Sequence, residues 1–448
     1  MRIARFILCC ASAGVPLAIS ACGGSSTPAA PIPLTRGAVT SLSKVLTYSP
    51  AAMNADPNGA VAAELAGPAV CAVTLYAIDY QTVGVSGERA NASAALFVPQ
   101  AGCNGPFPLV GYAHGTNVVK AQKITQPSTT NPQFTPPDQL PIAIAAFFAA
   151  HGYVTVATDY LGLGDSTYPY HPYLQGASEA TSVEDSLRAA RNAAKTIGIA
   201  LSGQVLLTGH SQGGHSAVWT QRIIESSASS EFDIAGNAPS SGPYDLTQTF
   251  LDSIANQSQD APILATYILT GYQKAYQNVY TTGPTDVFQN PWAGGIDSLL
   301  PVATFQDEVA LEGKTLPLSL SALLQASWES SFTSNAQSPA RVDTAMNDLV
   351  SGWAPKAPLF LCGGSRDPEV EFKNATIAQK YFASVGNKVT LLDVNPYIPP
   401  SIPLVDYHVT VADFCLPLAR KEFFDPLVAS GARARRTTGA SSRGSARS

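Results

Sequence analysis

The 448-residue sequence is poor in charge, and it shows no metal-binding motif and no internal repeat. Only 13% of the residues are charged and 45% are hydrophobic, which excludes disorder for most of the chain. None of the seven cysteines has the CxxC or histidine-rich spacing of a metal site, so we expect no bound metal. The formal net charge of −6 argues against nucleic acid as a partner, because an acidic surface repels polyphosphate.

The N-terminus has the layout of an export signal. Arg2 and Arg5 precede an apolar run over residues 6–19, which is shorter than the about 20 residues that a membrane-spanning helix needs. The run ends in Ile19-Ser20-Ala21-Cys22, which resembles the lipobox of bacterial lipoproteins. We therefore predict a lipoprotein-type signal peptide over 1–21, with lipidation of Cys22 and attachment to a membrane. An ordinary signal peptide, in which Cys22 is incidental, is the alternative.

The rest of the chain divides by composition. Residues 22–50 begin with a Gly/Ser/Pro/Ala-rich stretch and are predicted to be a tether. Residues 51–430 are predicted to form one enlarged domain. Residues 431–448 hold five arginines and no acid, and they are predicted to be a disordered basic tail. The protein is expected to leave the cytoplasm, either as a cell-envelope lipoprotein or as a secreted protein. The sequence does not indicate an oligomeric state.

Two β-rich runs at 73–83 and 90–98 predict an antiparallel hairpin, after which apolar runs alternate with helical patterns. This alternation predicts an α/β fold with a mainly parallel sheet and helices on both faces. Its expected strands are 108–113, 154–158, 204–208, 234–238, 359–362 and 388–393. The alternation breaks over about 245–353, where helical patterns predominate, and we interpret this stretch as a helical cap inserted over the active edge of the sheet.

Four cysteines lie outside the signal and the lipobox, and an even number in an exported protein points to disulfides. Three pairings are possible. We choose Cys71 with Cys103, because both lie at the open end of the predicted hairpin. The remaining pair, Cys362 with Cys415, brackets the candidate acid and base described below.

The segment Gly209-His210-Ser211-Gln212-Gly213 fits the pattern Gly-x-Ser-x-Gly. An apolar strand precedes it and a helical pattern follows it, which is the context of a nucleophile elbow. Its small residues are needed because the strand-to-helix turn leaves no room for side chains. Ser211 is therefore the candidate nucleophile.

A serine nucleophile needs a histidine base that is oriented by a carboxylate. Of six histidines, His408 alone lies beyond the last predicted strand, where we expect a loop-borne base. Asp367 follows the strand at 359–362 in a glycine-rich turn and is the candidate acid, although it can also be interpreted as a helix cap. Asp245, one strand earlier, is the rival.

Acyl transfer also needs preorganised donors for an oxyanion. The backbone N–H of Gln212, directly after the nucleophile, is one candidate. The other is the N–H of Thr116, which follows the strand at 108–113. We expect His114 to fix that loop rather than to act as a base.

The chain resembles the bacterial and fungal secretory lipase family of α/β-hydrolases over roughly residues 60–425. The resemblance rests on the elbow, on the helix around Ser186-Leu187-Arg188-Ala189-Ala190-Arg191, and on Tyr112-Ala113-His114-Gly115-Thr116, Thr158-Asp159-Tyr160-Leu161-Gly162-Leu163-Gly164 and His171-Pro172-Tyr173-Leu174. It implies the α/β-hydrolase fold with a helical cap, and hydrolysis of small-molecule or lipid carboxylic esters without a metal or organic cofactor. One departure is Gln212, where true lipases often carry a smaller residue, and it weakens an inference of long-chain triglyceride preference.

Three functions are compatible with this pattern. The first is an esterase or lipase that forms an acyl-enzyme on Ser211. The second is an exported serine peptidase of the aminopeptidase type, for which acids in the cap would bind a free amino terminus. The third is a surface binding protein without turnover, which the complete Ser211, Asp367 and His408 set disfavours.

Overall fold

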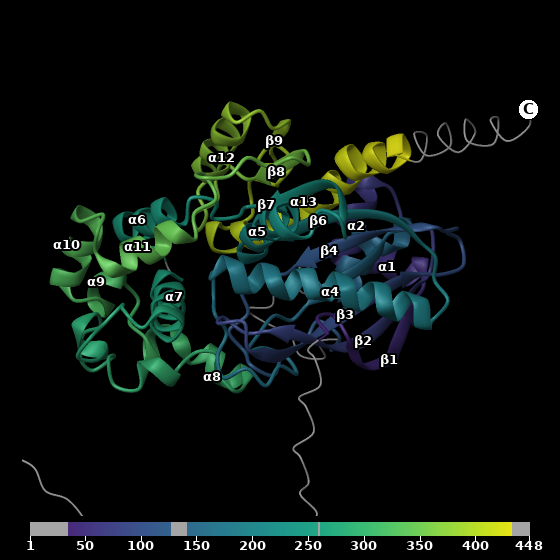
Figure 1. Cartoon of the computed structure of the whole chain (residues 1–448). Coiled ribbons are helices and arrows are strands. Elements are labelled where there is room, and N and C mark those ends of the chain that lie inside the picture. The colour runs from purple at the N-terminus through teal and green to yellow at the C-terminus, as the bar shows by residue number, and fades with distance from the viewer. Residues whose placement is uncertain (1–34, 127–140, 259, 432–448) are drawn as a thin grey trace, which may run out of the picture. The chain divides into compact units, whose positions relative to one another are not determined.

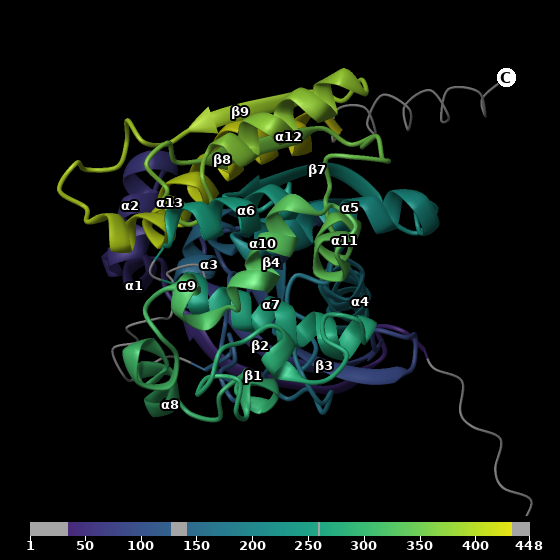
Figure 2. The same cartoon turned by 90° about the vertical axis from the view of Figure 1, so that its left-hand side faces the viewer.

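The computed structural model describes residues 35–126, 141–258 and 260–431 (Figures 1 and 2). The predicted signal peptide over 1–21, the candidate lipidation site Cys22 and residues 432–448 of the predicted tail lie outside these ranges. Among the described residues, no helix combines the length and the apolar composition that crossing a membrane requires.

In the described part of the chain, nine strands form one sheet in the order β1-β2-β3-β5-β4-β6-β7-β8-β9. Neighbours from β1 to β5 pair antiparallel, and neighbours from β5 to β9 are parallel. The strands are β1 (Val39–Tyr48), β2 (Val73–Val83), β3 (Arg89–Pro99), β4 (Phe107–Ala113), β5 (Val154–Thr158), β6 (Leu201–His210), β7 (Asp233–Ser240), β8 (Leu359–Gly363) and β9 (Val389–Asp393).

Helices cover both faces of this sheet, so β4, β5 and β8 are buried along their whole length. One face packs against α4 (Gly176–Thr196), α5 (Gln212–Ser227) and α12 (Lys373–Ser384). The other packs against α1 (Pro50–Ala55), α2 (Pro57–Ala66), α3 (Pro141–Phe147), η2 (Ala149–His151), α13 (Leu404–Ala419) and η6 (Arg420–Phe424). The predicted α/β fold with a mainly parallel sheet is confirmed.

The predicted tether over 22–50 extends too far. Val39–Tyr48 forms β1, which pairs with β2, and Arg36 forms ion pairs with Glu184 at 2.5 Å and Asp185 at 3.0 Å. The sequence pattern missed β1 because none of its side chains is fully buried, and only Val39, Leu42, Leu46 and Tyr48 are half-buried against the core. The backbone of β2 gives this strand its hydrogen-bond partners.

The elements between β7 and β8 are helical, as expected for 245–353, and they gather on one side of the sheet (Figure 1). Side chains of this insertion form an apolar cluster that also includes Val118, Val119, Tyr173 and Leu174. The elements are α6 (Leu246–Asn256), α7 (Ala261–Tyr276), η3 (Pro284–Asp286), η4 (Ile296–Ser298), α8 (Phe305–Val309), η5 (Leu311–Thr315), α9 (Leu320–Leu323), α10 (Ala326–Ser334) and α11 (Pro339–Met346).

Two disulfides join cysteines of the described segments, with the pairing chosen from the sequence. Cys71 is bonded to Cys103 across the open end of the β2–β3 hairpin. Cys362, in β8, is bonded to Cys415, in α13. The second bridge joins β8, which is the neighbour of the edge strand β9, to a helix that covers one face of the sheet.

Candidate active site

Ser211 occupies the turn between β6 and α5. Its backbone has φ 57° and ψ −121°, a region that non-glycine residues adopt only when the surrounding structure enforces it. A Cβ atom on Gly213 would lie 1.8 Å from the carbonyl oxygen of Ala113, so only glycine fits there. The close approach of two backbones therefore holds the serine in the strained turn, as the elbow motif predicts.

His408 lies within hydrogen-bond distance of this serine. Its Nε2 atom is 2.8 Å from Oγ of Ser211. The expected loop position of His408 is wrong, because the residue belongs to α13. The helix begins directly after Pro403, and its apolar face packs on the sheet, so the chain is already helical where the histidine points to Ser211.

Asp367 completes a continuous chain of contacts. Nδ1 of His408 lies 2.8 Å from one carboxylate oxygen of Asp367 and 3.0 Å from the other. The same carboxylate accepts hydrogen bonds from the hydroxyl of Ser241 at 3.0 Å and from the backbone N–H groups of Glu369 and Val370. These donors supply hydrogen-bond partners to both carboxylate oxygens and fix the orientation of the carboxylate toward the imidazole.

The alternatives to Asp367 are accounted for by other contacts. Asp245 accepts a hydrogen bond from the backbone N–H of Gln248 and thereby caps α6. Asp367 is not the cap of the following helix, because α12 begins at Lys373 with Phe372 at its N-cap.

His210 and His114 also lie near Ser211, and both are buried. The ring of His210 lies 4.8 Å from that of His408, and burial holds the pKa of His210 well below its usual value. His114 donates from Nδ1 to the carbonyl of Gly115 at 2.6 Å, and burial lowers its pKa to about 4. Both rings are therefore neutral at pH 7, and His114 has the loop-fixing contact expected for it.

The loop that carries Thr116 adjoins the elbow. Carbonyl oxygens of Ala113 and His114 lie against Gly213, the second residue of α5. The Thr116 hydroxyl is 2.6 Å from the hydroxyl of Tyr173, which ties this loop to the pocket wall. This arrangement agrees with N–H donors from Gln212 and Thr116, and that assignment stays a prediction.

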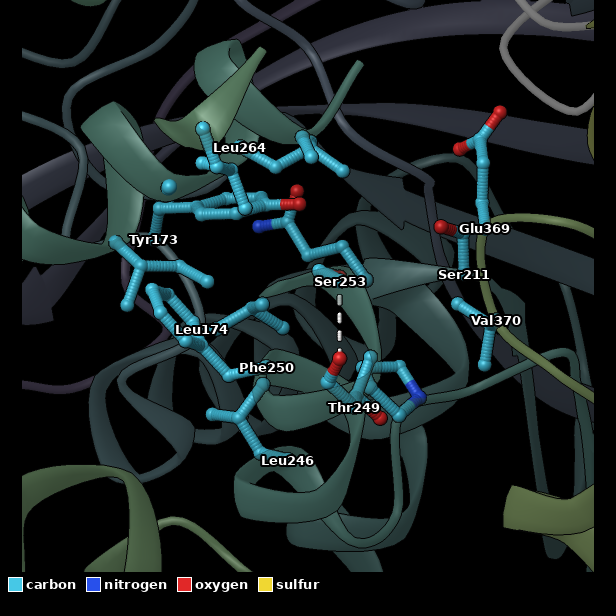
Figure 3. Close-up of a pocket in the computed structure, with 16 residues that line it drawn as sticks. Tyr173, Leu174, Ser211, Leu246, Thr249, Phe250, Ser253, Leu264, Glu369 and Val370 are labelled. Atoms are coloured by element: carbon cyan, nitrogen blue, oxygen red, sulfur yellow. Dashed lines mark hydrogen bonds between the residues drawn. The ribbon is translucent and has the colours of Figure 1, made fainter. Parts of the chain in front are cut away.

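A pocket of about 550 Å³, its open mouth included, lies beside Ser211 (Figure 3). Its wall is mostly apolar and comes largely from the inserted helices α6 and α7, from Leu320 and from the segment at 173–174. The side chains that form this wall include Leu246, Phe250, Leu264, Ala265, Ile268 and Leu320. The site thus combines a polar, hydrogen-bonded reaction centre with a predominantly apolar binding surface.

Glu369 also lines this pocket, and sequence reasoning missed it. Its Oε2 atom is 3.8 Å from Nε2 of His408, and its side chain hydrogen-bonds with Asp260 at the start of α7. Burial raises the pKa of Glu369 above its ordinary value. No motif in the sequence signals this residue, because its neighbours in space come from distant segments.

Among the residues that the structure describes, no group of three or more His, Cys, Asp or Glu is placed to hold a metal ion. The strained serine, the imidazole and the buried carboxylate form an unbroken hydrogen-bonded series. On a mainly parallel sheet with a nucleophile elbow, this arrangement defines the class of α/β-hydrolases with a serine at the reaction centre.

Comparison with known proteins agrees with this class. The model of the secretory lipase family matches residues 137–287. Among solved structures, the chain is similar to the rice cell wall degrading esterase LipA from Xanthomonas oryzae, with 35% identity and a TM-score of 0.76. That match covers 88% of this chain and 99% of the esterase. The chain therefore belongs to the secretory lipase family, and it is a carboxylic-ester hydrolase.

Two more distant structures share the fold. One is a putative hydrolase from Legionella pneumophila, with 20% identity, a TM-score of 0.71 and coverage of 87% of this chain and 98% of that one. The other is Candida antarctica lipase A in its closed state, with 18% identity, a TM-score of 0.57 and coverage of 80% and 76%. No curated protein sequence matches the chain.

Proposed function

We propose that this ester hydrolase acts through an acyl-enzyme on Ser211, with His408 as general base and acid and Asp367 as the residue that orients the imidazole. The observation that carries the proposal is the continuous series of 2.8 Å contacts from Ser211 Oγ to His408 and from His408 to Asp367. In the resting state Nδ1 of His408 donates to Asp367, and Nε2 accepts from Ser211.

Each half-reaction uses the same groups. Oγ of Ser211 forms a bond to the acyl carbon while His408 takes the serine proton, and the ester C–O bond then breaks as His408 protonates the leaving alcohol. Water repeats the sequence on the acyl-enzyme and releases the acid. The N–H groups of Gln212 and Thr116 are the proposed oxyanion donors, each worth about 3 kcal/mol of transition-state stabilisation.

The apolar wall supports a proposal for the acyl side of the substrate. Leu264, Phe250 and Leu246 lie on one side of the pocket in Figure 3, whereas Ser211 and Glu369 lie on the other. We propose that the acyl chain lies along the apolar side. The substrate is then a small-molecule or lipid ester whose alcohol part leaves on the side of Glu369.

The protein is exported, which agrees with its family and its two disulfides. We further propose that residues 1–21 are a lipoprotein-type signal peptide, that Cys22 is lipidated and that the insertion over 245–353 acts as a cap. Labelling of the expressed chain with a radioactive fatty acid tests the second point, because a Cys22→Ala variant would lose the label.

The test of the reaction is hydrolysis of p-nitrophenyl esters from acetate to palmitate by the protein without residues 1–22. Ser211→Ala is expected to abolish turnover. Ser227 is an exposed serine at the end of α5, the helix that follows Ser211. Ser227→Ala is the matched control and is expected to retain turnover. Turnover that survives in Ser211→Ala would refute the assignment, and faster cleavage of aminoacyl p-nitroanilides than of esters would favour the peptidase alternative.

A further inference from the structure

A buried carboxylate lies directly behind the nucleophile elbow. The side chain of Glu179, in α4, has no exposed surface and accepts three hydrogen bonds. The donors are the backbone N–H of Leu174 at 2.7 Å, the side-chain amide of Gln212 at 2.6 Å and the hydroxyl of Ser216 at 2.6 Å. A carboxylate is removed from water at a high free-energy cost, which these three neutral donors offset.

The contact with Gln212 belongs to a chain with defined donors and acceptors. His171 donates from Nδ1 to the carbonyl of Leu161 at 2.8 Å, so its Nε2 atom is an acceptor. The amide nitrogen of Gln212 is 2.8 Å from that Nε2 and 2.6 Å from Glu179, so its two hydrogens are directed to these two acceptors. Burial lowers the pKa of His171, which keeps the ring neutral in this role.

The contact with Leu174 holds a second part of the site. Leu174 has φ 54°, a left-handed conformation that is unfavourable for a leucine and needs support from its surroundings. The preceding residue, Tyr173, contacts the Thr116 hydroxyl at 2.6 Å, and both Tyr173 and Leu174 line the pocket. Glu179 is therefore bonded to the residue that bears one proposed oxyanion donor and to the segment that supports the other.

We propose that Glu179 is a positioning residue that sets the geometry of the oxyanion hole from behind, through Gln212 on one side and through the 173–174 segment on the other. This inference rests on the proposed acyl-enzyme mechanism. It also gives a role to the Gln212 side chain, because a smaller residue at that position would leave Glu179 without one of its three donors.

The test compares Glu179→Ala, Glu179→Gln and the control Glu184→Gln in the protein without residues 1–22. Glu184 is also buried in α4, but its partners are Arg36 and Arg188, away from the elbow. Glu179→Ala is expected to lower kcat by about 10- to 100-fold with KM within about two-fold, because small misplacements of reacting groups cost up to about 100-fold. Glu179→Gln keeps one acceptor oxygen and is expected to lie between Glu179→Ala and the parent.

Affinity for an alkyl boronic acid, a transition-state analogue, is expected to fall in parallel with kcat in the Glu179 variants. Glu184→Gln is expected to lower Tm without changing kcat or this affinity. In a Gln212→Ala background the cost of Glu179→Gln should shrink, because the two residues act through one contact.

Three results would overturn the inference: a Glu179→Gln variant with parental kcat and boronate affinity, an equal loss of kcat in Glu184→Gln, or additive effects of Glu179→Gln and Gln212→Ala. If Glu179→Ala does not fold, Glu179→Gln alone decides between these results. A parent without ester turnover would overturn the proposed mechanism as well, whereas an active parent with any of the three results would overturn only this inference.

Discussion

The disulfide between Cys362 and Cys415 is expected to affect catalysis as well as stability. Cys362 lies five residues before Asp367 in the chain, and Cys415 follows His408 by seven residues, which is about two turns of α13. The bridge therefore joins the strand that leads to Asp367 with the helix that carries His408. Loss of the bridge allows these two elements to move relative to each other, while Ser211 remains fixed in the turn between β6 and α5.

The expected loss of stability follows from the length of the closed loop. The two cysteines are separated by 53 residues, for which the loop-entropy relation gives about 4 kcal/mol. The second bridge, between Cys71 and Cys103, spans 32 residues and is worth about the same, close to 4 kcal/mol. The variant with both Cys71→Ala and Cys103→Ala is thus a control with a similar loss of stability at a site distant in the fold from His408.

Urea unfolding followed by fluorescence gives the free energy of unfolding of both double variants, and p-nitrophenyl butyrate hydrolysis gives kcat under conditions where each remains folded. We expect both variants to lose stability by about 4 kcal/mol. We expect only Cys362→Ala with Cys415→Ala to lower kcat, by about 10-fold or more. Equal kcat values in the two folded variants would refute the reasoning.

Three further predictions concern charged groups. Asp367→Asn is expected to lower kcat by about 10³- to 10⁴-fold, because an amide cannot stabilise the imidazolium. Ester hydrolysis measures kcat, and circular dichroism checks that the fold is intact. A loss of kcat below about 10-fold would contradict this role. Glu369→Gln removes a negative charge 3.8 Å from Nε2 of His408. It should therefore shift the acid limb of the pH profile of kcat/KM by about 1 pH unit to lower pH. An unchanged profile would contradict the interaction. Burial raises the pKa of Glu308 to about 7. The protonated side chain therefore contributes to folding stability below about pH 4.5, and this contribution is lost as the pH rises through 7. Glu308→Gln should therefore gain about 1 to 3 kcal/mol relative to the parent between pH 4 and pH 8 in urea unfolding, and a constant difference would contradict this reasoning.

The sequence predicts well the parts of this protein whose signal is local. The elbow is recognised because the backbone of Ala113 comes so close to Gly209 and Gly213 that only glycine fits at these positions. Both glycines lie within the same five consecutive residues as the serine. The parallel strands are predicted because burial on both faces demands continuous apolar runs. The chain order of nucleophile, acid and base then points to Asp367 and His408, which the structure brings together.

Features that depend on distant partners escape the sequence pattern. Strand β1 has no fully buried side chain, and it is held in place by backbone pairing with β2, which composition does not reveal. The position of His408 in a helix depends on how the chain after Pro403 packs against the sheet. Glu179 and Glu369 resemble ordinary acidic residues in the sequence, since Gln212 and Ser216 follow Glu179 by 33 and 37 residues and His408 follows Glu369 by 39 residues.

The division of the pocket between two parts of the chain has a consequence for how such an enzyme diversifies. The reacting groups come from the edge of the sheet, whereas Leu246, Phe250, Leu264 and other wall residues come from the insertion between β7 and β8. Substitutions in α6 and α7 can therefore change which acids are accepted without touching the proton-transfer geometry. The reacting groups and most of the pocket wall therefore lie on separate parts of the chain. A library of variants for new ester preferences is best confined to residues of α6 and α7.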